Sequence, residues 1–229
     1  MASFRQLNLA WKLSLVYKGL SPVSLLDSYT TERLPVIAEM LNITTGILDK
    51  MLKASSVEGA MAREERLNML GVNYRTSSIV VDEFTNAEPV NAYRVIDEGE
   101  LVAGDRAPDA PGLIPTANGA ETRLFDVFSA TYHTVLVFTP DASATTDILE
   151  VLRRYPEGVV RPVIVLPQGS NTTTVGQVDV VVDDGGHAYR AYLAVKGEQK
   201  VVVVRPDGVV GAIVHGAEGV GAYFGKIFV

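Results

Sequence analysis

The apolar residues of the chain change their spacing along its length, from a helical period to short β-branched runs. In residues 7–70 they recur every three or four positions, which is typical of amphipathic helices. From about residue 130 onward, runs such as His133–Phe138 alternate with helical segments, which is typical of an α/β domain with a buried sheet. The predicted units are a helical segment (1–75), an irregular connection rich in Pro, Gly, Asn and Asp (76–125) and an α/β domain (126–229).

Turn and breaker residues divide the helical segment into three or four helices. Gly19 stands where a first helix should end, and Ser21-Pro22 should start the next one, because Ser caps helices and Pro suits a first turn. Pro35 predicts a kink or a break, followed by a helix over about 36–53. Ser55-Ser56-Val57-Glu58 has the spacing of a capping box and predicts one further helix.

The strands and helices of the α/β domain follow a recognisable order. Strands are predicted at His133–Phe138, Pro162–Leu166, Val178–Val182, Val201–Arg205 and Val209–Val214, and helices at about 143–154 and 217–227. Pro206-Asp207-Gly208 is a strong hairpin turn between the last two strands. Strand–helix–strand, followed by a hairpin and a helix, is the order of a thioredoxin-like domain, whose mixed central sheet is flanked by helices.

The chain contains no cysteine. This excludes disulfides, thiolate metal sites and thiol redox cycles. In a thioredoxin-like domain the reactive thiolate would follow the first strand, where this chain has Asp141, Ala142, Ser143 and Ala144. A serine hydroxyl stays protonated at neutral pH unless a base activates it. We therefore expect Asp141 or Ser143 to cap the following helix rather than to act in catalysis.

Charge and hydropathy narrow the classes of partner. The chain has 20 Lys and Arg against 27 Asp and Glu, a net charge of −7, and neither half is basic. A surface that tracks nucleic-acid phosphates is therefore not expected. No apolar run approaches the roughly 20 residues of a membrane span, and the first residues do not resemble a signal peptide. The sequence predicts a cytoplasmic protein that binds neither nucleic acid nor membranes.

Several residues have both a structural and a functional interpretation. Asp183-Asp184-Gly185-Gly186-His187 contains metal-ligand types, but two adjacent aspartates and one histidine are too few for a site, so we predict a turn. Tyr189 and Tyr192 are expected to pack in the core, with stacking on a phenol or quinone as the alternative. His133 and His215 are interpreted as satisfied core or edge histidines. We expect no catalytic, cofactor-binding or metal-binding residue.

Five strings occur in the order found in one enzyme family. They are Asn8–Leu13, Leu25–Tyr29 with Glu32-Arg33 and Pro35, Gly104–Asp109, Thr122–Asp126 and Val203–Gly211. Together they resemble the carboxy-terminal region of FAD-dependent aromatic hydroxylases of the phenol 2-monooxygenase type. The resemblance implies the last helices of a flavin domain followed by a thioredoxin-like terminal domain.

In that family FAD is held by an amino-terminal Gly-rich βαβ unit, and this chain has no G-x-G-x-x-G. No cofactor is therefore expected in this chain. The resemblance implies a non-catalytic protein that acts in assembly or binding, with dimerisation through the helical segment as the expected role. The alternatives are a cysteine-independent antioxidant or small redox protein, and a binder of phenol-type or quinone-type ligands.

Trp11 bears on the expected assembly. Without a flavin domain, the helix that carries Trp11, Leu13 and Tyr17 would leave these side chains partly exposed, and large apolar patches are usually covered. We therefore predict that the helical segment either pairs with itself across a two-fold axis or folds back on the terminal domain.

Overall fold

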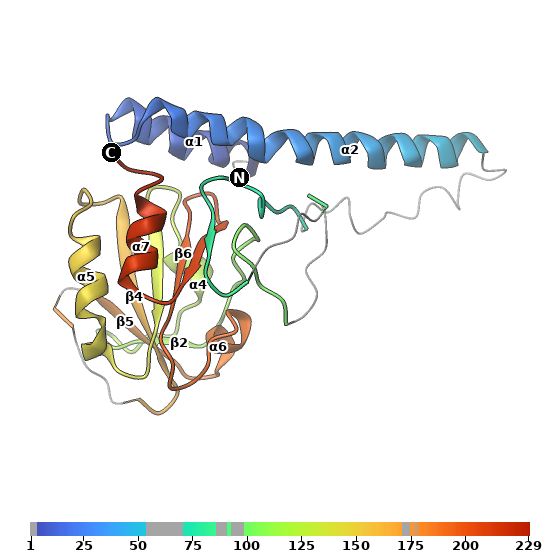
Figure 1. The fold of residues 1–229 in the computed structure, drawn as a ribbon. Helices are drawn as coiled ribbons and strands as arrows, with labels where there is room; N and C mark the ends of the chain where they lie inside the picture. The colour runs from blue at the N-terminus through green and yellow to red at the C-terminus, as the bar shows by residue number, and fades with distance from the viewer. Residues whose placement is uncertain (1–3, 54–70, 86–90, 93–98, 171–174, 177) are drawn as a thin grey trace.

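Two helices lie across one end of a seven-stranded sheet (Figure 1). The computed structural model describes residues 4–53, 71–85, 91–92, 99–170, 175–176 and 178–229. The helical elements are α1 (Phe4–Tyr17), η1 (Val23–Leu26), α2 (Asp27–Lys53), α4 (Leu124–Val127), η3 (Ala142–Thr145), α5 (Thr146–Leu152), α6 (His187–Ala191) and α7 (Ala217–Phe224). The strands are β1 (Val81–Asp82), β2 (Leu113–Pro115), β3 (His133–Phe138), β4 (Val160–Pro167), β5 (Asp179–Asp183), β6 (Lys200–Val204) and β7 (Val210–Val214).

The sheet is mixed, and its strand order is β1-β7-β6-β3-β4-β5-β2. β3, β4 and β5 run parallel, whereas β6 is antiparallel to both β3 and β7. The predicted fold class, a mixed sheet flanked by helices and preceded by a helical segment, is confirmed. All five predicted strands are present, with ends that differ by at most two residues. β1 and β2 lie in the segment 76–125, which was expected to be irregular, and they form the two edges of the sheet.

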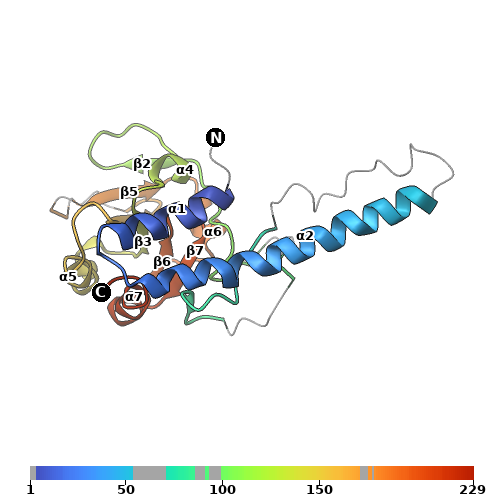
Figure 2. The same ribbon diagram turned by 90° about the horizontal axis from the view of Figure 1, so that it is seen from above.

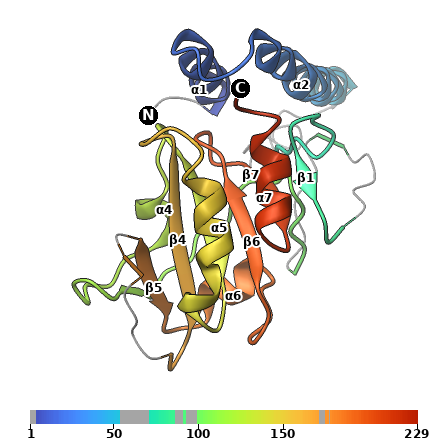
Figure 3. The ribbon, with the colours of Figure 1, turned by 60° about the vertical axis from the view of Figure 1, so that its left-hand side comes forward.

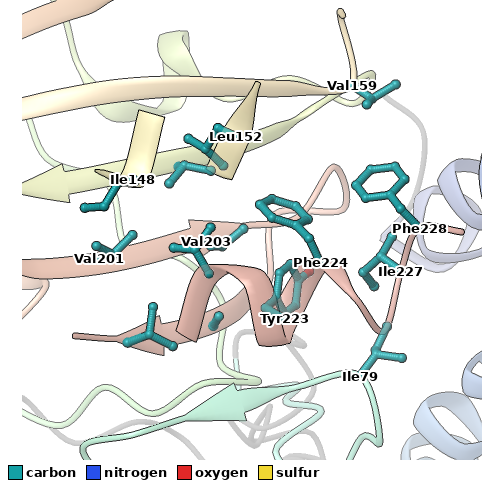
Figure 4. Packing of buried hydrophobic residues seen from close by; sticks show 14 of the residues in the cluster. Ile79, Ile148, Leu152, Val159, Val201, Val203, Tyr223, Phe224, Ile227 and Phe228 are labelled. Atoms are coloured by element: carbon teal, nitrogen blue, oxygen red, sulfur yellow. The ribbon is translucent and has the colours of Figure 1, made fainter. Parts of the chain in front are cut away.

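Both faces of the sheet are covered, which explains why the central strands are continuous valine-rich runs. Figure 3 shows α5 and α7 in front of the sheet. On that face Ile148 and Leu152 of α5 pack with Val201 and Val203 of β6 and with Phe224 of α7 (Figure 4). The opposite face is covered by α4, α6 and the stretch 101–113, through residues that include Leu101, Ala103, Ala110, Leu113, Leu124, Ala188, Tyr189 and Tyr192.

The predicted end of α1 near Gly19 is confirmed. Gly19 has a φ of +70°, and the amide of Leu20 donates to the carbonyl of Leu15 at 2.9 Å. A glycine at this position avoids the steric cost of a left-handed conformation that closes a helix. The predicted helix after the capping box Ser55-Ser56-Val57-Glu58 lies outside the described residues.

Of the kink or break predicted at Pro35, the break is wrong, because α2 continues through Pro35 to Lys53. Pro35 removes one amide donor, but both Thr31 and Pro35 are exposed, so water can solvate the carbonyl that loses its partner. Side-chain contacts of Glu32 and Arg33, described below, also fix the turn before the proline. Figure 2 shows that the second half of α2 extends well beyond the sheet and its helices.

No helix within the described ranges is both long enough and apolar enough to cross a membrane.

Candidate functional site

The segment after β3, where a thioredoxin-type thiolate would lie, is a helix cap. The carboxylate of Asp141 accepts a hydrogen bond from the amide of Ser143 at 2.9 Å and another from its hydroxyl at 2.6 Å. These two bonds, the hydroxyl bond first, lower the pKa of Asp141. Asp141 is therefore the cap of η3, as the sequence predicts, and the hydroxyl of Ser143 supports that cap.

Asp183 to His187 form a turn that starts α6, again as predicted. The buried carboxylate of Asp183 accepts from the amide of His187 and from the amide of Tyr189, both at 2.9 Å. A Cβ on Gly185 would lie 2.4 Å from the ring of the exposed His187, so a side chain there would require that ring to move. Among the residues that the structure describes, no group of three or more His, Cys, Asp or Glu side chains is placed to hold a metal ion.

Asp183→Ala is expected to lower the free energy of unfolding by about 2 kcal/mol, because two amide donors at the start of α6 lose their buried acceptor. Asp184→Ala is the matched control, since its side chain is exposed, and it should change stability by less than about 0.5 kcal/mol. Urea unfolding followed by circular dichroism measures both variants. Equal effects from the two substitutions would contradict the capping role.

Tyr189 and Tyr192 are core residues and offer no open face for a ligand. They are 4% and 0% exposed. The Tyr189 hydroxyl donates to the carbonyls of Thr139 and Val165, and the Tyr192 hydroxyl donates to the carbonyl of Pro108 at 2.7 Å. Burial raises the pKa of both phenols above the ordinary value. The core interpretation is therefore the one that the structure supports.

The two histidines singled out in the sequence differ in environment. His215 is exposed, with its ring centroid 4.1 Å from that of Phe84. His133 is 1% exposed, and its ring meets Trp11 edge to face at 5.1 Å. The expectation that His133 is fully satisfied is wrong, because its Nε2 has no hydrogen-bond partner. Burial first, and then the positive charge of Arg205, lower the pKa of His133 to about 3.

Sequence reasoning missed the main polar feature of the molecule, which is a buried set of charges between the helical segment and the sheet. We call Lys12 of α1, Glu32 of α2, and Arg205 and Asp207 of the β6–β7 turn the charge network. The guanidinium of Arg205 donates to both carboxylate oxygens of Glu32, at 2.7 and 3.0 Å, and also to Asp207, with Nε to Oδ1 at 3.0 Å. The side chains of all four residues are at most 1% exposed.

α1 completes the charge network. Lys12 Nζ donates to Glu32 at 2.8 Å, and the Asn8 amide donates to Glu32 at 2.7 Å and to Asp207 at 2.9 Å. Trp11 is 4% exposed, and its indole N–H donates to Asp207 at 3.3 Å. The helical segment therefore folds back on the terminal domain, which is one of the two outcomes predicted for Trp11.

The ionisation of the charge network follows from its contacts. Burial alone would raise the pKa of Glu32, but the cations Arg205 and Lys12 hold it well below its ordinary value. Burial, followed by the charge of Arg205, lowers the pKa of Lys12 to about 8, against the opposing pull of Glu32. Two cations and two anions balance, and each is hydrogen-bonded, which is what buried charges require. This arrangement holds two parts of the chain together, and each charge of the network is paired with another member of it.

A second buried ion pair anchors the connecting segment. The guanidinium of Arg75 donates to both carboxylate oxygens of Asp105, at 2.7 and 2.9 Å. Gly104 has a φ of +101°, and a Cβ there would lie 2.4 Å from the amide nitrogen of Arg75. In α2, Arg33 donates to the Tyr74 hydroxyl at 3.0 Å. These contacts fix residues 73–75 and 104–105 against each other and against α2.

Comparison with known proteins gives one family model and two curated relatives. The family model described as FAD binding domain matches residues 6–44. A flavin-dependent monooxygenase of Mycobacteroides abscessus is 37% identical over 141 residues, which are 62% of this chain and 25% of that protein. The pentachlorophenol 4-monooxygenase of Sphingobium chlorophenolicum is 31% identical over 214 residues, which are 87% of this chain and 36% of that protein. The chain thus spans about a third or less of these relatives.

Solved structures agree on the fold. The flavin-dependent monooxygenase PieE, solved with FAD and substrate, matches 96% of this chain and 42% of its own, with a TM-score of 0.64 and 17% identity. Aklavinone-11 hydroxylase, solved with FAD and aklavinone, matches 98% and 39%, with a TM-score of 0.63 and 21% identity. The match includes the helical segment as well as the sheet, so the arrangement of both parts is shared.

Proposed function

Because the chain is related to the FAD-dependent aromatic monooxygenases, we propose that it is a non-catalytic assembly module of that family, built on a thioredoxin-like core. The position of a thioredoxin-type thiolate holds the Asp141 cap, and the chain has no cysteine. The buried charges of the charge network are all engaged with one another. The proposed contribution of this chain is therefore contact rather than chemistry.

The observation that carries the proposal is the surface of the helical segment. This segment is fixed to the sheet by the charge network, yet it still exposes large apolar side chains, among them Leu13, Tyr17, Leu34, Leu41 and Leu48. Apolar surface of this kind on a rigid support is typical of an interface. We propose a homodimer in the cytoplasm. Any action on an aromatic substrate is proposed only for an assembly that also contains a flavin domain.

Size-exclusion chromatography with light scattering tests the proposal. At micromolar concentration we expect twice the mass of one chain, and after incubation with FAD we expect no flavin absorbance in the protein peak. A monomer would contradict the assembly role. Stoichiometric flavin in the peak would contradict the non-catalytic role.

A further inference from the structure

His133, at the start of β3, has one ring nitrogen that makes no hydrogen bond. The imidazole bonds to the backbone of Val159, whereas its Nε2 has no partner. Four aromatic rings surround it, at centroid distances of 5.1 Å for Trp11, 5.6 Å for Phe224, 6.0 Å for Tyr223 and 6.2 Å for Phe228. A buried polar atom without a hydrogen bond lowers stability. A movement that lets water reach Nε2 is therefore favoured by this atom.

Two helices contact the His133 ring, and they are held to the sheet to different degrees. α7 is packed into the core, where Tyr223 and Phe224 are both 0% exposed. α1 lies across the end of the sheet (Figure 1) and contacts the ring through Trp11. Among residues 6–17 of α1, the buried side chains are Asn8, Trp11, Lys12 and Leu15, and two of these four are polar. A helix that buries so little apolar surface is expected to open more readily than a core helix.

The contact between α1 and the sheet is incomplete beside the histidine. A cavity of about 320 Å³ lies there, with α1 on one side and the ends of β3 and β4 on the other. The residues that line it include Leu7, Ser14, Lys18, Thr131, His133 and Val159. Outward movement of α1 would therefore join this cavity to solvent and expose His133 first.

Opening of α1 would leave most of the charge network closed. The guanidinium of Arg205 donates to both oxygens of Glu32, at 2.7 and 3.0 Å, and to Asp207 at 3.0 Å, and none of these bonds involves α1. The charge that α1 contributes is Lys12, whose Nζ donates to Glu32 at 2.8 Å. Burial is the main reason why the pKa of Lys12 is lowered to about 8, so this ammonium gains hydration when α1 moves away. Water thus replaces part of what α1 loses.

The charged groups around His133 oppose its protonation while α1 is closed. Arg205 of the β6–β7 turn lowers the pKa of His133, and Lys18 of α1 lines the same cavity. Asp207, the anion of that turn, is paired with Arg205. α7 presents the phenol of Tyr223, whose pKa is raised by burial, so it stays neutral. The closed form therefore holds a neutral imidazole, whereas a hydrated imidazole takes up a proton near pH 6.5.

We propose that α1 opens away from the sheet as a unit while the sheet stays folded, and that His133 favours the open form as the pH falls below neutral. The hinge is the segment between α1 and η1, where Gly19 has a φ of +70°. This inference concerns how α1 is attached and does not depend on the proposed dimer. α1 lies within residues 6–44, which match the FAD binding domain model, so mild acid would loosen part of that segment.

Hydrogen exchange measured by mass spectrometry at several pH values tests the opening, after correction for intrinsic exchange rates. The pKa of His133 is lowered to about 3 in the closed form and returns to about 6.5 when the ring is hydrated. The open fraction of α1 should therefore rise about 25-fold between pH 7 and pH 5. α7 is the matched control, because it contacts the same ring. Its amides should be protected at least about 10-fold more than those of α1 at both pH values.

Two variants assign the effect to His133. In His133→Phe the protection of α1 should be the same at pH 7 and pH 5, because no imidazole remains under the helix. His215→Gln removes an exposed imidazole and should keep the wild-type dependence. Equal protection of α1 and α7 would show that α1 is released only by global unfolding and would overturn the inference. So would an open fraction of α1 that is constant between pH 7 and pH 5 in the wild-type protein, a result that needs no variant to fold.

Discussion

Arg205→Met is expected to lower the free energy of unfolding by about 3–5 kcal/mol, since removal of one partner leaves buried charges without compensation. The guanidinium of Arg205 contacts Glu32 on one side and Asp207 on the other, and all three side chains are at most 1% exposed. Methionine is apolar and replaces the aliphatic stem of Arg205, so contacts of the stem are kept and the loss of stability comes mainly from the removed guanidinium. Lys12 alone would then face two carboxylates.

Urea unfolding followed by tryptophan fluorescence measures this loss of stability where the helical segment contacts the sheet. Trp11 is the single tryptophan of the chain, and the Arg205 guanidinium lies 5.3 Å from its ring centroid. Arg161→Met is the matched control, because Arg161 and its partner Asp179 are 44% and 49% exposed. An exposed pair of this kind contributes at most about 1 kcal/mol. A loss for Arg205→Met no larger than for Arg161→Met would show that the charge network does not hold the two parts together.

The charge network was not predicted from the sequence, because its members are far apart along the chain. Glu32 and Arg205 are 173 residues apart, and neither belongs to a local pattern that fixes its partner. One signal was available: Glu32 occupies a helical position between Leu25, Ser28 and Val36, which are all buried. A charge at a core-facing position must find a buried partner. The strings Asn8–Leu13, Glu32-Arg33 and Arg205–Gly208, which carried the family resemblance, are the ones that meet here.

Local chemistry made other parts predictable. The valine runs of the central strands and the Asp141 cap need only neighbouring residues, and the structure has them where they were expected. The edge strands β1 and β2 have two and three residues, which is too short for any period to be visible. Pro35 was misjudged because the strength of a helix break depends on solvent access and on tertiary anchoring, which spacing does not reveal.

The free energy of unfolding is expected to fall by about 2 kcal/mol between pH 7 and pH 5 because of His133. In the folded protein the pKa of His133 is lowered to about 3, mainly by burial. In the unfolded chain it returns to its ordinary value of about 6.5. The unfolded state therefore binds a proton below pH 6.5 that the folded state does not bind until about pH 3. The stabilisation that depends on a neutral His133 is fully present above pH 6.5 and is lost as the pH falls from 6.5 toward 3.

The choice of pH range separates His133 from the charge network. The pKa of Glu32 is also lowered in the folded protein, but a depressed carboxylate pKa reduces stability only as the pH falls below the ordinary range of carboxylates, near pH 4.5. Between pH 7 and pH 5 the lowered carboxylate pKa values therefore contribute little to the dependence of the free energy of unfolding on pH. Urea midpoints measured at several pH values in this range therefore report the protonation of His133.

His133→Phe is the variant that decides the assignment. A phenyl ring suits the surrounding cluster of Trp11, Tyr223, Phe224 and Phe228, and no partner of Nε2 is lost because it has none. The variant should therefore keep its stability nearly constant between pH 7 and pH 5, whatever its absolute value. His215→Gln removes an exposed imidazole and should retain the wild-type slope. An unchanged slope in His133→Phe would mean that the buried imidazole is not the group that titrates.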